Sequence, residues 1–120
     1  MLKWQLSGRR AKWPKHLANR TYAPPPPRVD GKAMVATWIG QSTVLVQAAG
    51  LNILTDPFLS ERASPLSFAG PRRVRPPGLT MEMLPEIDLI LLSHNHYDHM
   101  DLPALRHIAK RHRAALVTPL

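Results

Sequence analysis

The chain of 120 residues contains no cysteine, which excludes disulfides, thiolate zinc sites and thiol nucleophiles. It also lacks any apolar run near the roughly 20 residues that cross a bilayer. Its N-terminus has basic residues but no apolar core of the kind found in secretory signals. These features are compatible with a protein of the reducing cytoplasm, which we expect here, with peripheral contact to a membrane left open.

Acidic residues are also scarce, with 8 against 16 lysines and arginines, for a net charge of +8. Eight of the basic residues lie in the first 32 positions, where Asp30 is the only acid. The tract Pro24–Pro27 can neither continue a helix nor donate to a sheet, so it indicates an extended spacer. We therefore predict a basic, proline-rich segment over 1–32 and a folded domain over 33–120.

A positive charge of this size could attract nucleic acid or an anionic lipid surface. The ordinary interpretation, a solvated tail and solvated helix face, is favoured because aromatic residues that could stack on bases are not interleaved with the basic clusters. Nucleic acid is therefore the less favoured partner. The sequence leaves the oligomeric state unknown.

Short apolar runs predict five strands and one helix. Asp101 can cap a helix that runs to about His112, with an apolar face made of Leu102, Leu105, Ile108 and Ala109. The strands are predicted at 33–39, 43–47, 51–55, 87–92 and 114–118, with a long irregular segment from 58 to 85. Three antiparallel strands followed by a strand–helix–strand crossover indicate an α/β fold with a mixed sheet. A single helix cannot cover both faces of that sheet, so the domain looks incomplete.

The most informative segment follows the fourth predicted strand and reads His-Asn-His-Tyr-Asp-His. Its metal-binding side chains are His94, His96, Asp98 and His99. Imidazole nitrogens and carboxylate oxygens are zinc ligands at about 2.0–2.2 Å, and a loop after a buried strand is a common place for a site. A purely structural polar loop is the alternative, but four such side chains in six positions favour a metal site.

The spacing suggests a division between two ions. His94 and His96, two residues apart in an extended segment, point the same way, whereas Asp98 and His99 are better placed for a second ion. Two ions about 3.5–4 Å apart can share a bridging hydroxide. A catalytic zinc normally has three protein ligands, so at least one further ligand per ion must come from elsewhere.

The other candidate residues are weaker. Asp56 ends a strand that could neighbour the metal strand, where its carboxylate could orient the histidine loop from the second shell or simply cap an Asp-Pro turn. His16 lies in the basic segment. His107 and His112 are expected on the exposed face of the helix.

The motif His-x-His-x-Asp-His resembles the main metal motif of the metallo-β-lactamase superfamily. Three further segments resemble the branch that contains N-acyl-phosphatidylethanolamine-hydrolysing phospholipase D. They are Trp38-Ile39-Gly40-Gln41-Ser42-Thr43, Ile53-Leu54-Thr55-Asp56-Pro57, and Arg62-Ala63-Ser64-Pro65 with Phe68-Ala69-Gly70-Pro71-Arg72-Arg73. Gln41 stands where many relatives carry histidine, but that position is not a metal ligand.

The resemblance implies an αββα sandwich with two zinc ions at one edge, of which this chain would be the N-terminal part. It implies that His94 and His96 bind one zinc ion and that Asp98 and His99 bind the other. It also implies that Asp98 is catalytic and orients a metal-bridging hydroxide, and that Asp56 takes the strand-end aspartate position. The expected substrate is a small or lipid-like phosphodiester or ester, and the isolated chain is expected to be inactive. The alternatives are a non-catalytic metal-binding module, a basic module that binds nucleic acid or anionic membrane, and a nuclease of the same superfamily.

Overall fold

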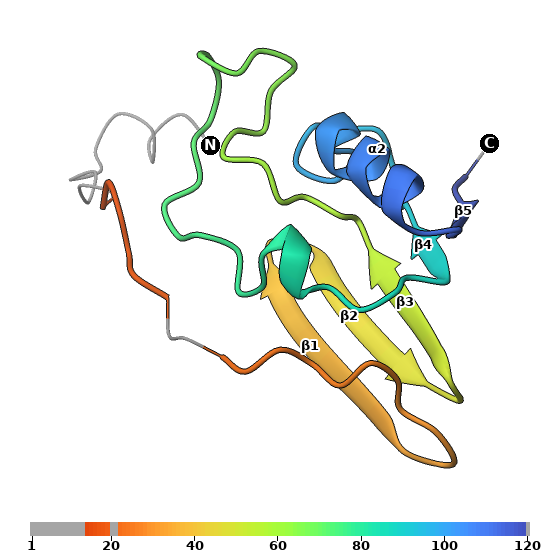
Figure 1. The fold of residues 1–120 in the computed structure, drawn as a ribbon. Helices are drawn as coiled ribbons and strands as arrows, with labels where there is room; N and C mark the ends of the chain where they lie inside the picture. Colours follow the sequence, from red (N-terminus) through yellow and green to blue (C-terminus); the bar gives the residue numbers. More distant parts are fainter. Residues whose placement is uncertain (1–13, 20–21, 120) are drawn as a thin grey trace, which may run out of the picture.

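The computed structural model describes residues 14–19 and 22–119. Five strands form one sheet in chain order: β1 (Met34–Gly40), β2 (Thr43–Ala48), β3 (Leu51–Thr55), β4 (Leu89–Leu91) and β5 (Ala115–Val117) (Figure 1). The first three strands are antiparallel, whereas β4 pairs parallel to β3 and β5 parallel to β4. The predicted mixed sheet with a parallel crossover is confirmed.

The crossover between β4 and β5 contains helix α2 (Leu102–Arg111). Asp101 caps it as predicted, because its carboxylate accepts from the Ala104 amide at 3.1 Å. The same carboxylate accepts from the Leu59 and Ser60 amides at 3.0 and 2.7 Å. Asp101 therefore fastens the chain after β3 to the start of α2. In the described part of the chain, no helix has the length and apolarity needed to cross a membrane.

The core lies between α2 and one face of the sheet. Its buried members are Ile39, Leu45, Leu54, Leu79, Leu84, Ile87, Ile90 and Ile108. Helix α2 buries only Ala104 and Ile108, one turn apart, while Leu105 packs at the margin. The predicted apolar face was too wide, since Leu102 and Ala109 are exposed.

His112 corrects a second expectation, because it is buried and does not lie on the exposed face of the helix. It is the residue at which α2 ends, with extended φ and ψ of −124° and 154°. The helical periodicity used to place it therefore no longer applies. The Ile87 amide donates to His112 Nδ1 at 3.4 Å.

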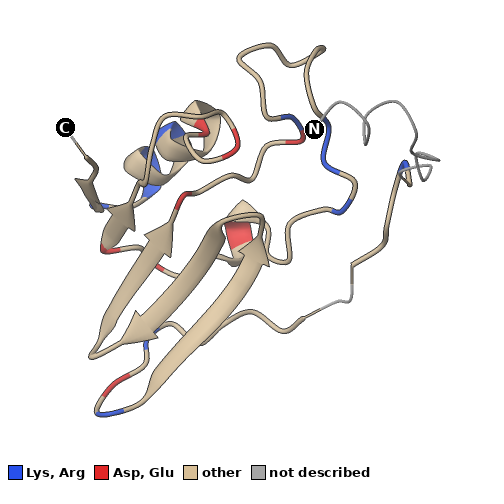
Figure 2. Cartoon of the chain, turned by 180° about the vertical axis from the view of Figure 1, so that it is seen from behind, with Lys and Arg blue, Asp and Glu red and all other residues tan. Residues whose placement is uncertain are grey.

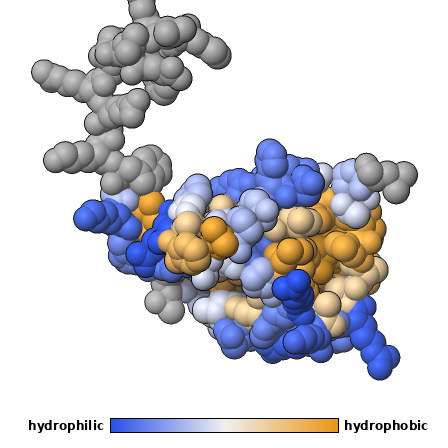
Figure 3. Space-filling view, turned by 90° about the horizontal axis from the view of Figure 1, so that it is seen from above, coloured by the Kyte–Doolittle hydropathy of each residue, from blue (hydrophilic) through white to orange (hydrophobic). Residues whose placement is uncertain are grey.

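The opposite face of the sheet remains apolar and exposed. Alternation and register place Met34 and Trp38 of β1, Leu51 of β3, Leu91 of β4 and Val117 of β5 on this face. Figure 3, a view from above, shows exposed apolar side chains gathered on one side of the molecule. The half-covered sheet expected from the single predicted helix is thus present.

The proline tract, predicted as an extended spacer, is bonded to the sheet. Gln47 Nε2 donates to the Pro26 carbonyl, and Asn52 Nδ2 to the Pro27 carbonyl, each at 2.8 Å. Gln47 and Asn52 are fully buried, and Gln47 Nε2 also donates to Asn52 Oδ1 at 2.9 Å. Packed structure therefore begins before Lys32. Five of the eight basic residues of the N-terminal segment lie outside the described residues.

Candidate metal centre

The sheet topology brings three separate segments to one edge. Because β3 and β4 are parallel, Asp56 and the histidine loop follow their carboxyl ends side by side. The Asp56 amide donates to the Leu91 carbonyl at 2.9 Å. The turn between β1 and β2 reaches the same edge, since β2 runs antiparallel to β3.

The three imidazoles of the motif lie together. The ring centroid of His94 is 4.6 Å from that of His96 and 4.0 Å from that of His99. A turn closes the loop, because the His99 and Met100 amides both donate to the His96 carbonyl, at 2.9 and 2.7 Å. The side chains predicted to bind metal therefore converge on one region.

Asp98 and His99 are spaced nearly as two ligands of one ion. The distance from His99 Nε2 to Asp98 Oδ2 is 3.7 Å. Two donors bound tetrahedrally at zinc bond lengths lie about 3.3–3.5 Å apart, so a small adjustment would bring both atoms within reach of one ion.

The Asp56 carboxylate accepts several hydrogen bonds from the histidine loop and the residue before it. Its carboxylate accepts from the Ser93 amide at 2.7 Å, the Ser93 hydroxyl at 2.8 Å and His99 Nδ1 at 2.9 Å. Burial raises the pKa of Asp56, but the hydrogen bonds from Ser93 and His99 outweigh it and leave that pKa below its usual range. The ionised carboxylate therefore favours the His99 tautomer with its proton on Nδ1, which leaves the Nε2 lone pair free.

Two contacts to the histidine loop, from Gln41 and Ser42, were not predicted from the sequence. Gln41 Nε2 donates to Asp98 Oδ2 at 3.0 Å, and Ser42 Oγ lies 3.1 Å from His99 Nδ1. The predicted strand order could have indicated these contacts. Because the second strand runs antiparallel to the third, the turn between the first two strands lies at the edge where the third and fourth strands end. The Gly-Gln-Ser-Thr turn is thus part of the wall of the candidate centre.

The donor set fits zinc in kind but is incomplete in number. Within the described part of the chain, no three side chains among histidine, aspartate and glutamate are disposed to hold one ion. In the predicted pairing of His94 with His96 and of Asp98 with His99, each ion would receive two donors from this loop. The assignment of these residues as ligands, and of Asp56 as their support, stays a prediction.

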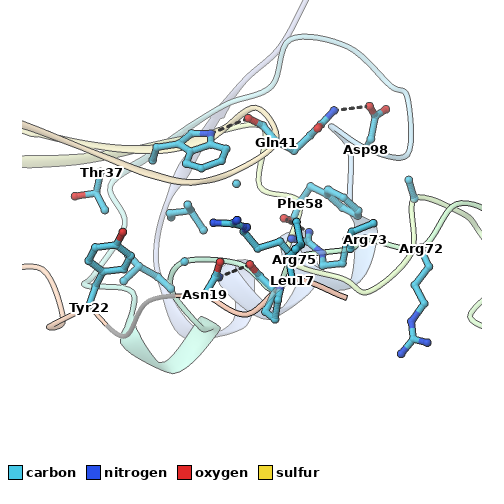
Figure 4. A pocket seen from close by; sticks show the side chains of 18 of the residues that line it. Leu17, Asn19, Tyr22, Thr37, Gln41, Phe58, Arg72, Arg73, Arg75 and Asp98 are labelled. Carbon is cyan, nitrogen blue, oxygen red and sulfur yellow. Dashed lines mark hydrogen bonds between the residues drawn. The ribbon is translucent and has the colours of Figure 1, made fainter. Parts of the chain in front are cut away.

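A groove of about 1350 Å³ adjoins the candidate centre. Trp38, Phe58 and Leu79 contribute apolar wall, and His96 and Asp98 line the end at the histidine loop. Figure 4 shows Gln41 and Asp98 joined at the rim of this groove, with Phe58 and Arg73 below them. Trp38 Nε1 donates to the Gln41 carbonyl at 2.9 Å, which fixes the indole beside the same turn.

The three arginines of the 72–75 segment differ in their availability. Arg72 points away from the groove in Figure 4 and pairs with Glu61. Arg73 donates to the Phe58 and Ser60 carbonyls at 2.8 Å and stacks over the Phe58 ring at 4.3 Å, and burial lowers its pKa. Arg75 is exposed, lines the groove and makes no hydrogen bond within the described residues. Arg75 is therefore the arginine with donors available to a ligand.

Comparison with known proteins gives the family. The model of the β-lactamase superfamily domain matches residues 51–120, which include the strand-end aspartate and the whole histidine motif. The chain belongs to this superfamily. The resemblance first seen in the short motifs is confirmed over more than half of the chain.

Several curated proteins are similar in sequence to this chain. An N-acyl-phosphatidylethanolamine-hydrolyzing phospholipase D 1 of Caenorhabditis elegans is 49% identical over 75 residues, which cover 62% of this chain and 21% of that protein. An uncharacterized protein of Mycobacterium bovis is 35% identical over 126 aligned residues, with coverage of 100% and 32%. A UPF0173 metal-dependent hydrolase of Anaeromyxobacter is 41% identical, with coverage of 78% and 29%. The chain thus spans a fifth to a third of the length of these relatives.

Proposed function

We propose that this chain supplies the histidine-rich part of a two-zinc centre in a hydrolase that cleaves phosphodiester bonds of lipid-like substrates. The observation that carries the proposal is the convergence of His94, His96, Asp98 and His99 at one sheet edge, with Asp56 bonded to His99 Nδ1. The relatives named as hydrolases support the same reaction class. A cytoplasmic location with peripheral membrane contact belongs to this proposal.

In this proposal His94 and His96 hold one zinc ion, and Asp98 and His99 hold the other. Bound zinc would act as a Lewis acid and lower the pKa of a coordinated water. The chain's own residues orient and support that chemistry. Asp56 keeps the His99 Nε2 lone pair free on the side that faces Asp98, and Gln41 holds Asp98 so that its carboxylate could accept a hydrogen bond from a metal-bound water.

The groove supports a substrate with a long apolar part. Its walls beside the candidate centre include Trp38, Phe58 and Leu79, and Arg75 offers a guanidinium to an anionic group. Burial of apolar surface contributes about 25 cal/mol per Å², so an acyl chain would gain more here than a compact polar substrate. The Caenorhabditis elegans relative is named for the hydrolysis of N-acyl-phosphatidylethanolamine, a phospholipid with acyl chains.

Zinc titration of the purified chain tests the proposal. We expect weak binding that His94→Ala with His96→Ala reduces at least tenfold, because that pair would lose both of its imidazole donors. The matched control is His16→Ala with His107→Ala, which removes two exposed histidines outside the loop. Zinc binding that is lost equally in both double variants, or in neither, contradicts the assignment.

Turnover gives a second measurement. Since no three donors of the described residues serve one ion, and a catalytic zinc normally has three protein ligands, we expect no hydrolysis of a generic phosphodiester by the 120 residues alone. Robust zinc-dependent turnover by this chain would refute that expectation.

A further inference from the structure

The loop from Ala63 to Pro71 projects from the fold and carries exposed apolar side chains (Figure 1). Phe68 is 78% exposed, the highest value among the large apolar residues in the described part of the chain, and Leu66 is 48% exposed. Both belong to a nine-residue stretch with no charged residue. Two apolar side chains at the tip of a projecting loop are costly in water and indicate a contact surface.

The neck of this loop is held in a defined shape. The Ala63 amide donates to the Pro71 carbonyl at 3.0 Å, and the Arg73 amide to the Glu61 carbonyl at 2.9 Å. Arg62 reaches across to the Gly70 carbonyl at 2.8 Å. The loop thus presents its tip without a large ordering cost on binding.

Gly70 allows this neck to close. Its φ is +94°, and a Cβ there would lie 2.6 Å from the Cβ of Ser64. Ser64 Oγ in turn accepts from the Leu66 amide at 3.1 Å. The backbone under the exposed Leu66 is therefore fixed by a contact that only glycine at position 70 permits.

Basic charge surrounds the base of the loop while its tip has none. Figure 2 shows the tip uncoloured by charge, with lysine and arginine positions at its base. These positions are Arg62, Arg72, Arg73 and Arg75, against the single acid Glu61. An apolar tip above a basic collar matches the order of layers in an anionic bilayer, where phosphates lie outside the acyl chains.

We propose that the 63–71 loop docks this protein on anionic membranes, with Leu66 and Phe68 inserted at the headgroup boundary and the positively charged base of the loop, where Arg75 has donors available, facing lipid phosphates. A bilayer fits better than a protein partner, because specific protein interfaces need about 800 Å² on each side and this tip offers two large side chains. The inference rests on the peripheral membrane contact of the proposed function and names the surface that makes it, but it does not depend on the metal centre, which zinc titration tests separately.

The position of the loop gives this docking a consequence. Ala63, Pro71 and Arg75 line the groove that leads to the histidine loop. Docking through the loop therefore places the groove beside the lipid surface, so that a lipid-like ligand could enter it without crossing bulk water.

Vesicle sedimentation tests the proposal with the full chain. Vesicles of phosphatidylcholine with phosphatidylglycerol are compared with pure phosphatidylcholine, and we expect binding to the anionic vesicles. Leu66→Ser with Phe68→Ser should lower the partition coefficient by about tenfold or more, as expected for two lost apolar insertions. The control, Met34→Ser with Leu51→Ser, removes apolar residues of comparable exposure from the far end of the sheet and should bind within about twofold of the parent.

All these variants keep the N-terminal basic segment, so its charge contributes equally to each. Binding unchanged in the loop variant, an equal loss in both double variants, or no binding of the parent would overturn the proposal. The last outcome would leave a protein as the partner class for this tip.

A second readout does not require the serine variants to fold. Because the chain has no cysteine, Phe68→Cys and Met34→Cys can each carry a single environment-sensitive fluorophore. We expect a blue shift with anionic vesicles for the probe at position 68 and none for the probe at position 34. A probe at position 68 that stays in an aqueous environment on bound protein overturns the proposal.

Discussion

Asp56 Oδ2 accepts a hydrogen bond from His99 Nδ1 at 2.9 Å, across 43 positions of sequence. The two residues meet because β3 and β4 are adjacent and parallel, so that the residues after their carboxyl ends share one edge. Asp56 has a positive φ of 35°, a region that aspartate tolerates better than most residues other than glycine. The backbone at the end of β3 is thus turned so that the carboxylate faces the histidine loop.

The first prediction concerns Asp56→Asn. The amide has nearly the same shape, but it is neutral and presents donors on one side, so it no longer selects the His99 tautomer with a free Nε2. Loss of such a supporting contact typically costs 10–100-fold in metal affinity, and we expect a loss in that range by competition with a chromophoric chelator. The control is Glu61→Gln, which changes an exposed ion pair with Arg72 outside the histidine loop. This variant should leave zinc affinity unchanged. Equal zinc affinity of Asp56→Asn and the parent would show that the contact supports the fold only.

The second prediction concerns the clip between the sheet and the proline tract. Asn52→Ala removes the donors to the Pro27 and Glu86 carbonyls, at 2.8 and 2.7 Å, and the acceptor for Gln47. Each buried polar group left unpaired costs about 1–3 kcal/mol, so the free energy of unfolding in urea should fall by about 2 kcal/mol or more. Asn95→Ala, at an exposed loop position, should change it by less than about 0.5 kcal/mol. Similar effects of the two substitutions would mean that the proline tract contributes little to stability.

Periodicity and cap chemistry were sufficient to predict the five strands and helix α2, but not the short 3-10 helix at Met81–Met83. The third strand has the predicted bounds, and Asp101 caps α2 as predicted. The fourth strand was predicted over 87–92 but pairs only over Leu89–Leu91. Ile87 and Leu92 are buried although they lie outside β4, so these positions are apolar because they pack in the core and not because they pair in the sheet. An apolar run cannot separate these two causes.

The proximity of the motif's side chains was predictable from the sequence, but only some of their contacts were. The four side chains of the motif converge, but the roles of Gln41 and Ser42 depend on which turn reaches the sheet edge. The contacts of the proline tract were missed for a similar reason. Gln47 and Asn52 alternate with Leu45 and Leu54 on the core side, and polar residues at such positions require partners, which here are proline carbonyls. The polar residues Gln47 and Asn52 at core positions of two strands therefore indicated that another segment packs there, and this indication was missed.

The third prediction concerns acid stability and Asp88. The hydrogen bond from Arg28, with the charge of Arg28 and the Asn52 amide, holds the pKa of Asp88 below its usual range despite partial burial. A lowered folded-state pKa stabilises the fold above the unfolded value of about 3.9. That stability is lost as the pH falls through the folded-state pKa of Asp88. Asp88→Asn should therefore be less stable than the parent near neutral pH, with the difference shrinking below about pH 4, as measured by urea unfolding across pH. A difference that does not change with pH would exclude the ion pair as its source.

The fourth prediction concerns the buried His112. Burial is the main cause that lowers its pKa; the neighbouring Arg111 lowers it further, and Glu86 partly opposes them. Within the described residues its Nε2 is buried without a hydrogen-bond partner, so no hydrogen bond at that atom stabilises the protonated ring. A depressed histidine pKa means that the unfolded chain takes up the proton first, at about pH 6.5. The free energy of unfolding should therefore fall as the pH drops from about 6.5 to the folded-state pKa, and then change no further through this residue.

His112→Leu removes that titration while keeping an apolar side chain at the end of α2. The difference in unfolding free energy, variant minus parent, cancels the contributions of the other five histidines. We expect this difference to shift in favour of the variant as the pH is lowered from 8 to 5, because only the parent must keep a neutral ring buried. His107→Leu, at an exposed position of the same helix, should show no such trend. A flat difference for His112→Leu would mean that His112 becomes protonated as readily in the folded chain as in the unfolded one, and that the end of α2 opens to water at low cost.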